Sequence, residues 1–95
     1  MVTVIWDTRV RAEVEQAGCD LIRRIWADMT RFSGYVSHRL LKDKDDAGHF
    51  IIVSKWTDRD SADRTLKMYS NAEPVRLLAP LLAAPRQRFV LDELA

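Results

Sequence analysis

The spacing of apolar residues changes several times along this chain, and these changes limit the folds that it can form. Residues 2–10 alternate between two sides and include strong β formers, which predicts a strand. From residue 11 to residue 32, apolar residues recur every three or four positions, which predicts an amphipathic helix. Ser33 and Gly34 follow as a helix stop, so strand and helix alternate from the start of the chain.

The rest of the sequence predicts two more helices and three more strands. Residues 35–41 and 50–56 form strands that the polar segment 42–48 joins as a hairpin. Thr57 is expected to cap a helix through Tyr69, and residues 70–74 begin a short helix that carries apolar residues to position 82. After Pro85 comes a last strand, residues 87–91. The order β-α-β-β-α-(α)-β predicts an α+β, ferredoxin-like antiparallel sheet with helices on one face, and residues 1–95 form a single domain.

The predicted strands carry large apolar side chains on both faces. Phe50 and Ile52 point to one side of their strand, and Ile51 and Val53 point to the other. A sheet that is apolar on both sides needs cover on both sides, and a 95-residue chain has helices for only one. The simplest second cover is another copy of the chain, which predicts a two-fold homodimer packed sheet to sheet.

Charge and cysteine content exclude several classes of protein. Fifteen Lys and Arg balance fourteen Asp and Glu, giving a formal charge of +1, so we expect no nucleic-acid partner. Cys19 is the only cysteine, which leaves no internal disulfide and no cysteine zinc site. The most apolar stretch, residues 77–84, is too short to span a membrane, and we expect a cytoplasmic protein without a membrane partner.

Three parts of the chain stand out together: residues 32–37 with residues 40–43, residues 50–58, and residues 74–82 with Pro85 and Arg86. They resemble the helix-to-strand junction, the third strand and the closing segment of the antibiotic biosynthesis monooxygenase family of dimeric α/β barrels. The resemblance implies a homodimer with a pocket in each subunit between sheet and helices. It also implies a monooxygenase that oxidises a small aromatic phenol, anthrone or quinol with O₂ and without a cofactor or metal.

Only Trp56 carries over cleanly as the pocket-lining tryptophan of that family. The anthrone-oxidising members have a Tyr six residues after it and an Asn four residues before it, where this chain has Ala62 and Ile52. This departure keeps open a non-catalytic, dimeric binding module of the same fold as the alternative function.

Haem degradation, another activity of the family, is disfavoured. It needs a His on the second helical segment, and this chain has no His after His49. It also needs an Asn at the end of the first strand, where Asp7 and Thr8 stand instead.

Oxygenation without a cofactor requires a dry pocket, a base and a shape that holds the substrate. Trp56 suits a pocket wall whose N–H could hold a substrate oxygen. His38 is the candidate base, because neutral imidazole accepts protons near pH 7. An even pairing register places Val36 and His38 on the face of Trp56, and a slip of one residue places Tyr35 there instead. The even register gives the more apolar face and favours His38.

The other candidates have weaker support from the sequence. The expected substrate-binding residues are Trp6, Tyr35, Ile52, Tyr69 and Arg88. Arg86 and Arg88 either hold an anionic substrate or pair with Asp92 and Glu93, and Trp26 belongs to the core or to a helix edge. Asp43, Asp45 and Asp46 lack the closing Glu of a calcium loop, so they and His49 are expected in an exposed turn.

Overall fold

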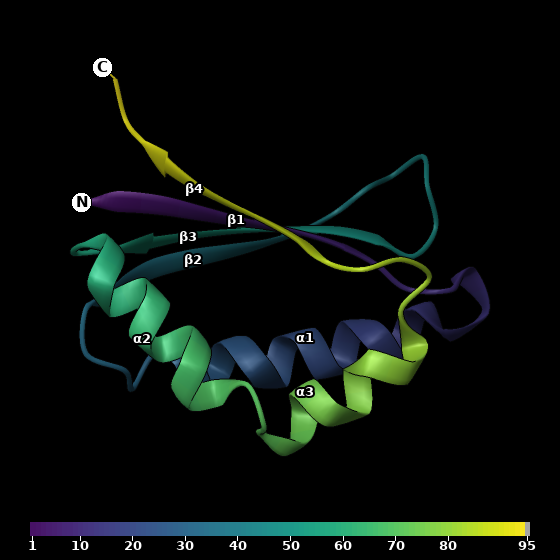
Figure 1. Ribbon diagram of the computed structural model, residues 1–95. Coiled ribbons are helices and arrows are strands. Elements are labelled where there is room, and N and C mark those ends of the chain that lie inside the picture. Colours follow the sequence, from purple (N-terminus) through teal and green to yellow (C-terminus); the bar gives the residue numbers. More distant parts are fainter. Residues whose placement is uncertain (95) are drawn as a thin grey trace.

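Four antiparallel strands form one sheet in the order β2–β3–β1–β4. The structure, a computed structural model, describes residues 1–94. The strands are β1 (Val2–Arg9), β2 (Tyr35–Lys42), β3 (His49–Trp56) and β4 (Gln87–Asp92). The α-helices are α1 (Glu15–Met29), α2 (Arg59–Tyr69) and α3 (Glu73–Leu78), with short 3₁₀ turns η1 (Ala12–Val14) and η2 (Ala79–Leu81). All three helices lie on one side of the sheet (Figure 1), which confirms the ferredoxin-like α+β fold.

The core lies between the sheet and the helices, and β3 shows how the strands divide their two faces. Phe50, Ile52, Ser54 and Trp56 are buried beneath the helices, while the residues between them are partly exposed. This alternation follows from the period of two in an extended strand. Helix α1 supplies the opposing apolar stripe, in which Ile22 is nearly inaccessible.

The opposite face of the sheet carries no helix (Figure 1). Apolar side chains remain open to solvent there, with Phe89 46% and Leu91 and Leu41 each 42% exposed. The expectation of two apolar faces is therefore met by the structure. Within residues 1–94, no helix is both long and apolar enough to cross a membrane.

Three helix boundaries differ from the sequence prediction. The helix expected from residue 11 starts as the turn η1, and α1 itself ends at Met29 rather than at residue 32. The cap of α2 is Asp58 rather than Thr57, since Asp58 Oδ1 accepts a hydrogen bond of 2.7 Å from the Ser61 N–H. The Thr57 N–H instead donates to the Gly34 carbonyl at 2.8 Å, which ties α2 to the junction before β2.

A β-bulge at the start of β2 changes which side chains face the helices. Tyr35 pairs with Trp56, but Ser37 pairs with Lys55, so Val36 is an extra residue in the ladder. After the bulge the register is even, and His38 lies opposite Ser54. Tyr35 and His38 therefore share the inner face, and the expectation that Val36 joins them is wrong because Val36 is 40% exposed.

Candidate active-site cavity

A cavity of about 110 Å³ lies between the sheet and the three helices. Its walls include all three tryptophans of the chain, Trp6 from β1, Trp26 from α1 and Trp56 from β3. Ile52 and Tyr69 also line it. The chamber is therefore mainly aromatic and apolar, as small-molecule sites commonly are.

The indole N–H of Trp56 is already bonded within the protein. Trp56 Nε1 donates to Ser54 Oγ at 3.1 Å, and the Ser54 hydroxyl donates to the Val4 carbonyl at 3.0 Å. Ser54 is fully buried, so no water competes for these bonds. The expectation that this N–H is free to hold a substrate oxygen is wrong, and Trp56 offers the cavity its ring.

Tyr35 and His38 form a polar pair behind the aromatic wall. The Tyr35 hydroxyl lies 2.6 Å from His38 Nδ1, and the His38 ring packs 5.5 Å from the ring of Trp26. Tyr35 meets Trp56 edge to face at 5.8 Å. Burial lowers the pKa of the His38 imidazole, which keeps it neutral. Neither residue is among those that line the cavity, so the pair supports the wall from behind.

Two arginines line the cavity beside Trp6, Arg86 just before β4 and Arg88 within it. The Arg86 guanidinium carbon lies 4.8 Å from the centre of the Trp6 ring, and that of Arg88 lies 5.7 Å from it. Arg88 also donates to Asp63 Oδ1 at 2.8 Å, so the expected pairing with the chain's last acids is wrong for Arg88. Arg86 has no hydrogen bond or ion pair to any residue of 1–94, and burial lowers the pKa of its guanidinium.

Tyr69 connects the cavity to helix α1. Its hydroxyl donates to Asp28 Oδ2 at 2.5 Å, and its ring meets Phe32 edge to face at 5.9 Å. Burial, followed by the hydrogen bond to Asp28, raises the pKa of the Tyr69 hydroxyl. Tyr69 is therefore a neutral phenol at any physiological pH.

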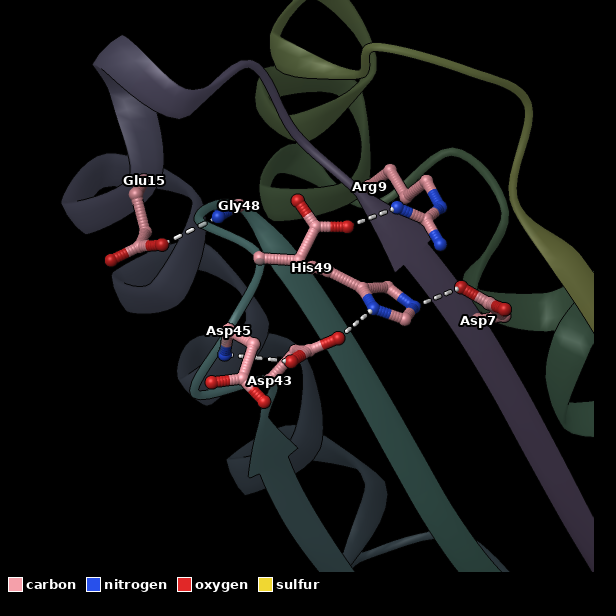
Figure 2. Close-up of polar contacts among 8 residues, drawn as sticks. Asp7, Arg9, Glu15, Asp43, Asp45, Gly48 and His49 are labelled. Atoms are coloured by element: carbon pink, nitrogen blue, oxygen red, sulfur yellow. Dashed lines mark hydrogen bonds and ion pairs between the residues drawn. The ribbon is translucent and has the colours of Figure 1, made fainter.

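A second polar cluster surrounds His49, where the C-terminal end of β1 lies beside the N-terminal end of β3 (Figure 2). His49 Nδ1 lies 2.8 Å from Asp43 Oδ2, and Nε2 lies 2.8 Å from Asp7 Oδ1. Arg9 pairs with Asp46 at 2.7 Å beside it. Only 13% of the His49 side chain is exposed, so its expected place in an open turn is wrong.

This cluster is an ion-pair network. Ligand atoms of Asp43, Asp46 and His49 lie within 4.8 Å of one another, a spacing that could hold a metal ion. Both ring nitrogens of His49 already contact carboxylates, however, and these contacts suit a protonated imidazolium. The hydrogen bond that His49 donates to Asp43 raises the pKa of His49, with a smaller contribution from Asp7.

The structure brings together five of the seven residues that the sequence analysis selected. The cavity is lined by Trp6, Ile52, Trp56, Tyr69 and Arg88, while Tyr35 and His38 lie behind its wall. The sequence gives no signal for Trp26 or Asp28 as site residues. On an amphipathic helix, Trp26 fits the apolar stripe and Asp28 fits the polar one, as residues without a functional role also do. Only the packing of α1 on the sheet shows that Trp26 reaches the cavity.

The family of the chain follows from a sequence comparison. The family model described as "Antibiotic biosynthesis monooxygenase" matches residues 1–68, which include β1, α1, the β2–β3 hairpin and most of α2. This chain belongs to that family. The family match supports a monooxygenase, and the aromatic cavity between sheet and helices agrees with such an activity. Among curated proteins, none matches the chain.

Solved structures share the fold along nearly the whole chain. A putative antibiotic biosynthesis monooxygenase from Nitrosomonas europaea superposes with a TM-score of 0.88 at 19% identity, covering 100% of both chains. SnoaB, a cofactor-independent oxygenase from Streptomyces nogalater, superposes with a TM-score of 0.80 at 23% identity, covering 97% of this chain and 93% of its own. A putative family member from Deinococcus radiodurans gives 0.85 at 17% identity, covering 98% and 92%. At these identities the likeness shows the fold alone.

Proposed function

We propose that this protein is a homodimeric, cofactor-independent monooxygenase that oxidises a single-ring phenol or quinol with O₂. The observation that carries the proposal is an aromatic cavity lined by a half-buried arginine, Arg86, that has no acidic partner within residues 1–94. Membership of the family and the structural likeness to the oxygenase SnoaB support the reaction type.

The volume of the cavity favours one aromatic ring over fused rings. An engineered cavity of about 150 Å³ binds benzene. The cavity of this protein measures about 110 Å³, so a single ring already fills it and a three-ring anthrone extends beyond it. The flat rings of Trp6, Trp26 and Trp56 suit edge-to-face or offset contacts with such a ring.

Arg86 provides the charge that the reaction needs. A phenol reacts with O₂ after its hydroxyl loses a proton, because the phenolate gives up an electron more readily. The phenoxyl radical and superoxide then combine to form a C–O bond on the ring, and loss of water leaves a quinone. A guanidinium stays protonated and stabilises the phenolate in surroundings of low dielectric constant. Trp56 holds the ring while the radicals recombine.

A binding module without catalysis is the second candidate function. At two positions of the cavity wall this chain has apolar side chains, where the anthrone-oxidising members of the family carry polar ones. Ala62 and Ile52 both line the cavity and offer no hydrogen bond to a substrate. Such a module binds the ring and the anionic oxygen but consumes no O₂.

Oxygen uptake separates the two candidates. The purified protein, free of added cofactor, is expected to consume O₂ with hydroquinone and to do so faster than with anthrone. Arg86→Gln is expected to lower kcat/KM for hydroquinone by about 100-fold, since it removes the charge that stabilises the anion. Arg23→Gln, a change at an exposed arginine on α1, is the matched control. Saturable quenching of tryptophan fluorescence without O₂ uptake would identify the binding module.

A further inference from the structure

Asp28 and Tyr69 form a hydrogen-bonded pair that runs from the cavity to the surface of α1. Tyr69, the last residue of α2, lines the cavity and is 9% exposed. Its hydroxyl donates to Asp28 Oδ2 at 2.5 Å. The Asp28 side chain is 38% exposed, and its other oxygen accepts from Arg31 Nη2 at 3.2 Å. One end of the pair therefore lines the cavity, and the other end is exposed to water.

We propose that this pair is a proton relay that carries the hydroxyl proton of the substrate out of the cavity. The inference rests on the proposed function, because it takes a phenol or quinol as the substrate. Tyr69 is the catalytic residue of the relay, and Asp28 acts through it. The phenol oxygen of a tyrosine can accept one hydrogen bond while it donates another. Tyr69 therefore accepts from the substrate while it donates to Asp28.

The step balances without any electron transfer. The O–H bond of the substrate breaks as its proton moves to the Tyr69 oxygen, and the original Tyr69 proton moves to Asp28 Oδ2. Asp28 then releases that proton to water, and the phenolate stays in the cavity with Arg86. The relay returns to its starting state, so no oxidant or reductant is consumed.

The charges around Tyr69 agree with a relay. Burial and the contact with Asp28 disfavour a tyrosinate, while the positive charges of Arg24 and Arg31 act in the opposite direction more weakly. Tyr69 therefore does not hold a negative charge but passes a proton on as it receives one. The stable anion is the substrate, next to a guanidinium.

The alternative role for this pair is purely structural, as a tie that holds α1 and α2 together. Tyr69 already packs against Phe32 through its ring, so its position depends only in part on the hydroxyl. A structural tie affects the stability of the fold and the affinity for every substrate alike. A relay affects only substrates that arrive protonated, and that difference defines the test.

The experiment compares oxygen uptake at pH 8.5 for two single-ring quinols that both keep C–H carbons for oxygenation. Hydroquinone is protonated at this pH, whereas the hydroxyl between the two chlorines of 2,6-dichlorohydroquinone is largely ionised. Asp28→Asn and Tyr69→Phe are each expected to lower kcat for hydroquinone by about 100-fold, in line with the usual contribution of general acid–base catalysis. For 2,6-dichlorohydroquinone both variants are expected to stay within about threefold of the wild type, because its reacting hydroxyl is already ionised.

Glu73→Gln is the matched control, because it removes the carboxylate of an ion pair between α1 and α3, Arg24 Nη2 to Glu73 Oε1 at 3.1 Å. Tyr69→Phe keeps the ring packing and serves as the test if Asp28→Asn does not fold. Folded variants that oxidise hydroquinone at the wild-type rate, or that lose both substrates equally, would overturn the relay. A wild-type protein that consumes no O₂ with either quinol would overturn the proposed function instead.

Discussion

Trp56 takes its orientation from a serine two residues earlier on the same strand. Because side chains alternate along β3, Ser54 and Trp56 point to the same face, and the serine hydroxyl can accept from the indole N–H. The same hydroxyl donates to the Val4 carbonyl on the neighbouring strand. One buried side chain thus fixes the ring that forms a wall of the cavity.

Ser54→Ala is expected to lower the free energy of unfolding by about 1–3 kcal/mol, because it leaves a buried indole N–H without an acceptor. Urea denaturation followed by tryptophan fluorescence measures this change. Ser37→Ala on the exposed side of β2 is the control and is expected to change stability by less than about 0.5 kcal/mol. Equal stability of the two variants would mean that Trp56 finds another partner.

His49 makes the stability of the fold depend on pH. Its pKa is raised above the usual value near 6.5, chiefly by Asp43. The stabilisation is therefore fully present below about pH 6.5, and it is lost as the pH rises through the higher pKa of the folded state. His49→Gln is expected to cost about 1 kcal/mol at pH 6 and much less at pH 9.

Urea denaturation at the two pH values tests this expectation. Arg24→Gln is the control, because it breaks an exposed ion pair with Glu73 that does not involve His49. An arginine does not titrate in this range, so its deficit is expected to be the same at both pH values. A deficit of His49→Gln that does not change with pH would show that the imidazole acts by packing and not by its charge.

At the scale of the elements, the bulge in β2 has the largest effect on the site. One extra residue, Val36, places two polar aromatic side chains, Tyr35 and His38, on the same face of the sheet three positions apart. From the sequence alone, these two residues are alternatives set by the register of the strands. The bulge makes them partners, and together they support Trp26 and Trp56 from behind.

A glycine at the junction of α1 and β2 allows α2 to approach closely. Gly34 has φ +90°, and a Cβ at this position would overlap the Cβ of Ser61 on α2. Gly34→Ala is therefore expected to destabilise the fold by at least about 2 kcal/mol, through backbone strain and the clash together. Gly18→Ala on α1 is expected to cost less, because its Cβ meets only the side chain of Val10 at 3.0 Å and alanine favours the helix. In thermal unfolding, Gly34→Ala is expected to have the lower Tm of the two variants. A lower Tm for Gly18→Ala would show that close packing at Gly34 is not what limits this junction.

The sequence is enough to predict the elements of this fold but only part of its site. Strands and helices repeat their buried side chains with fixed periods, so local spacing indicates where they lie. The bulge depends on how two strands pair, and the His49 contact joins residues 42 positions apart in sequence. The bond between Tyr69 and Asp28 likewise joins two helices that pack only in the folded chain. These features come from tertiary packing, on which local spacing carries no information.

At the scale of the molecule, the uncovered face of the sheet supports a dimer. Phe89 and Leu91 on β4 and Leu41 on β2 are exposed large apolar residues on that face. Exposed apolar patches commonly mark interaction sites, and a two-fold axis lets one such face cover its copy. We therefore expect a dimer at micromolar concentration in analytical ultracentrifugation.

Phe89→Glu is expected to shift the protein to a monomer, because dimerisation would then bury a charge in an apolar interface. Met68→Glu is the control, since Met68 is 70% exposed on α2, away from the sheet face. A wild-type monomer, or a variant Phe89→Glu that remains dimeric, would contradict sheet-to-sheet pairing.

We propose that the cavity of this chain alone promotes the reaction of a single-ring phenol or quinol with O₂. The most direct measurement uses ¹⁸O₂ with protein treated with a chelator and with hydroquinone as the substrate, and analyses the products by mass spectrometry. We expect one ¹⁸O atom in the ring product and one in water, at a rate that falls strongly in Arg86→Gln. Product without ¹⁸O, or equal labelling with Arg86→Gln or with no protein present, would contradict it.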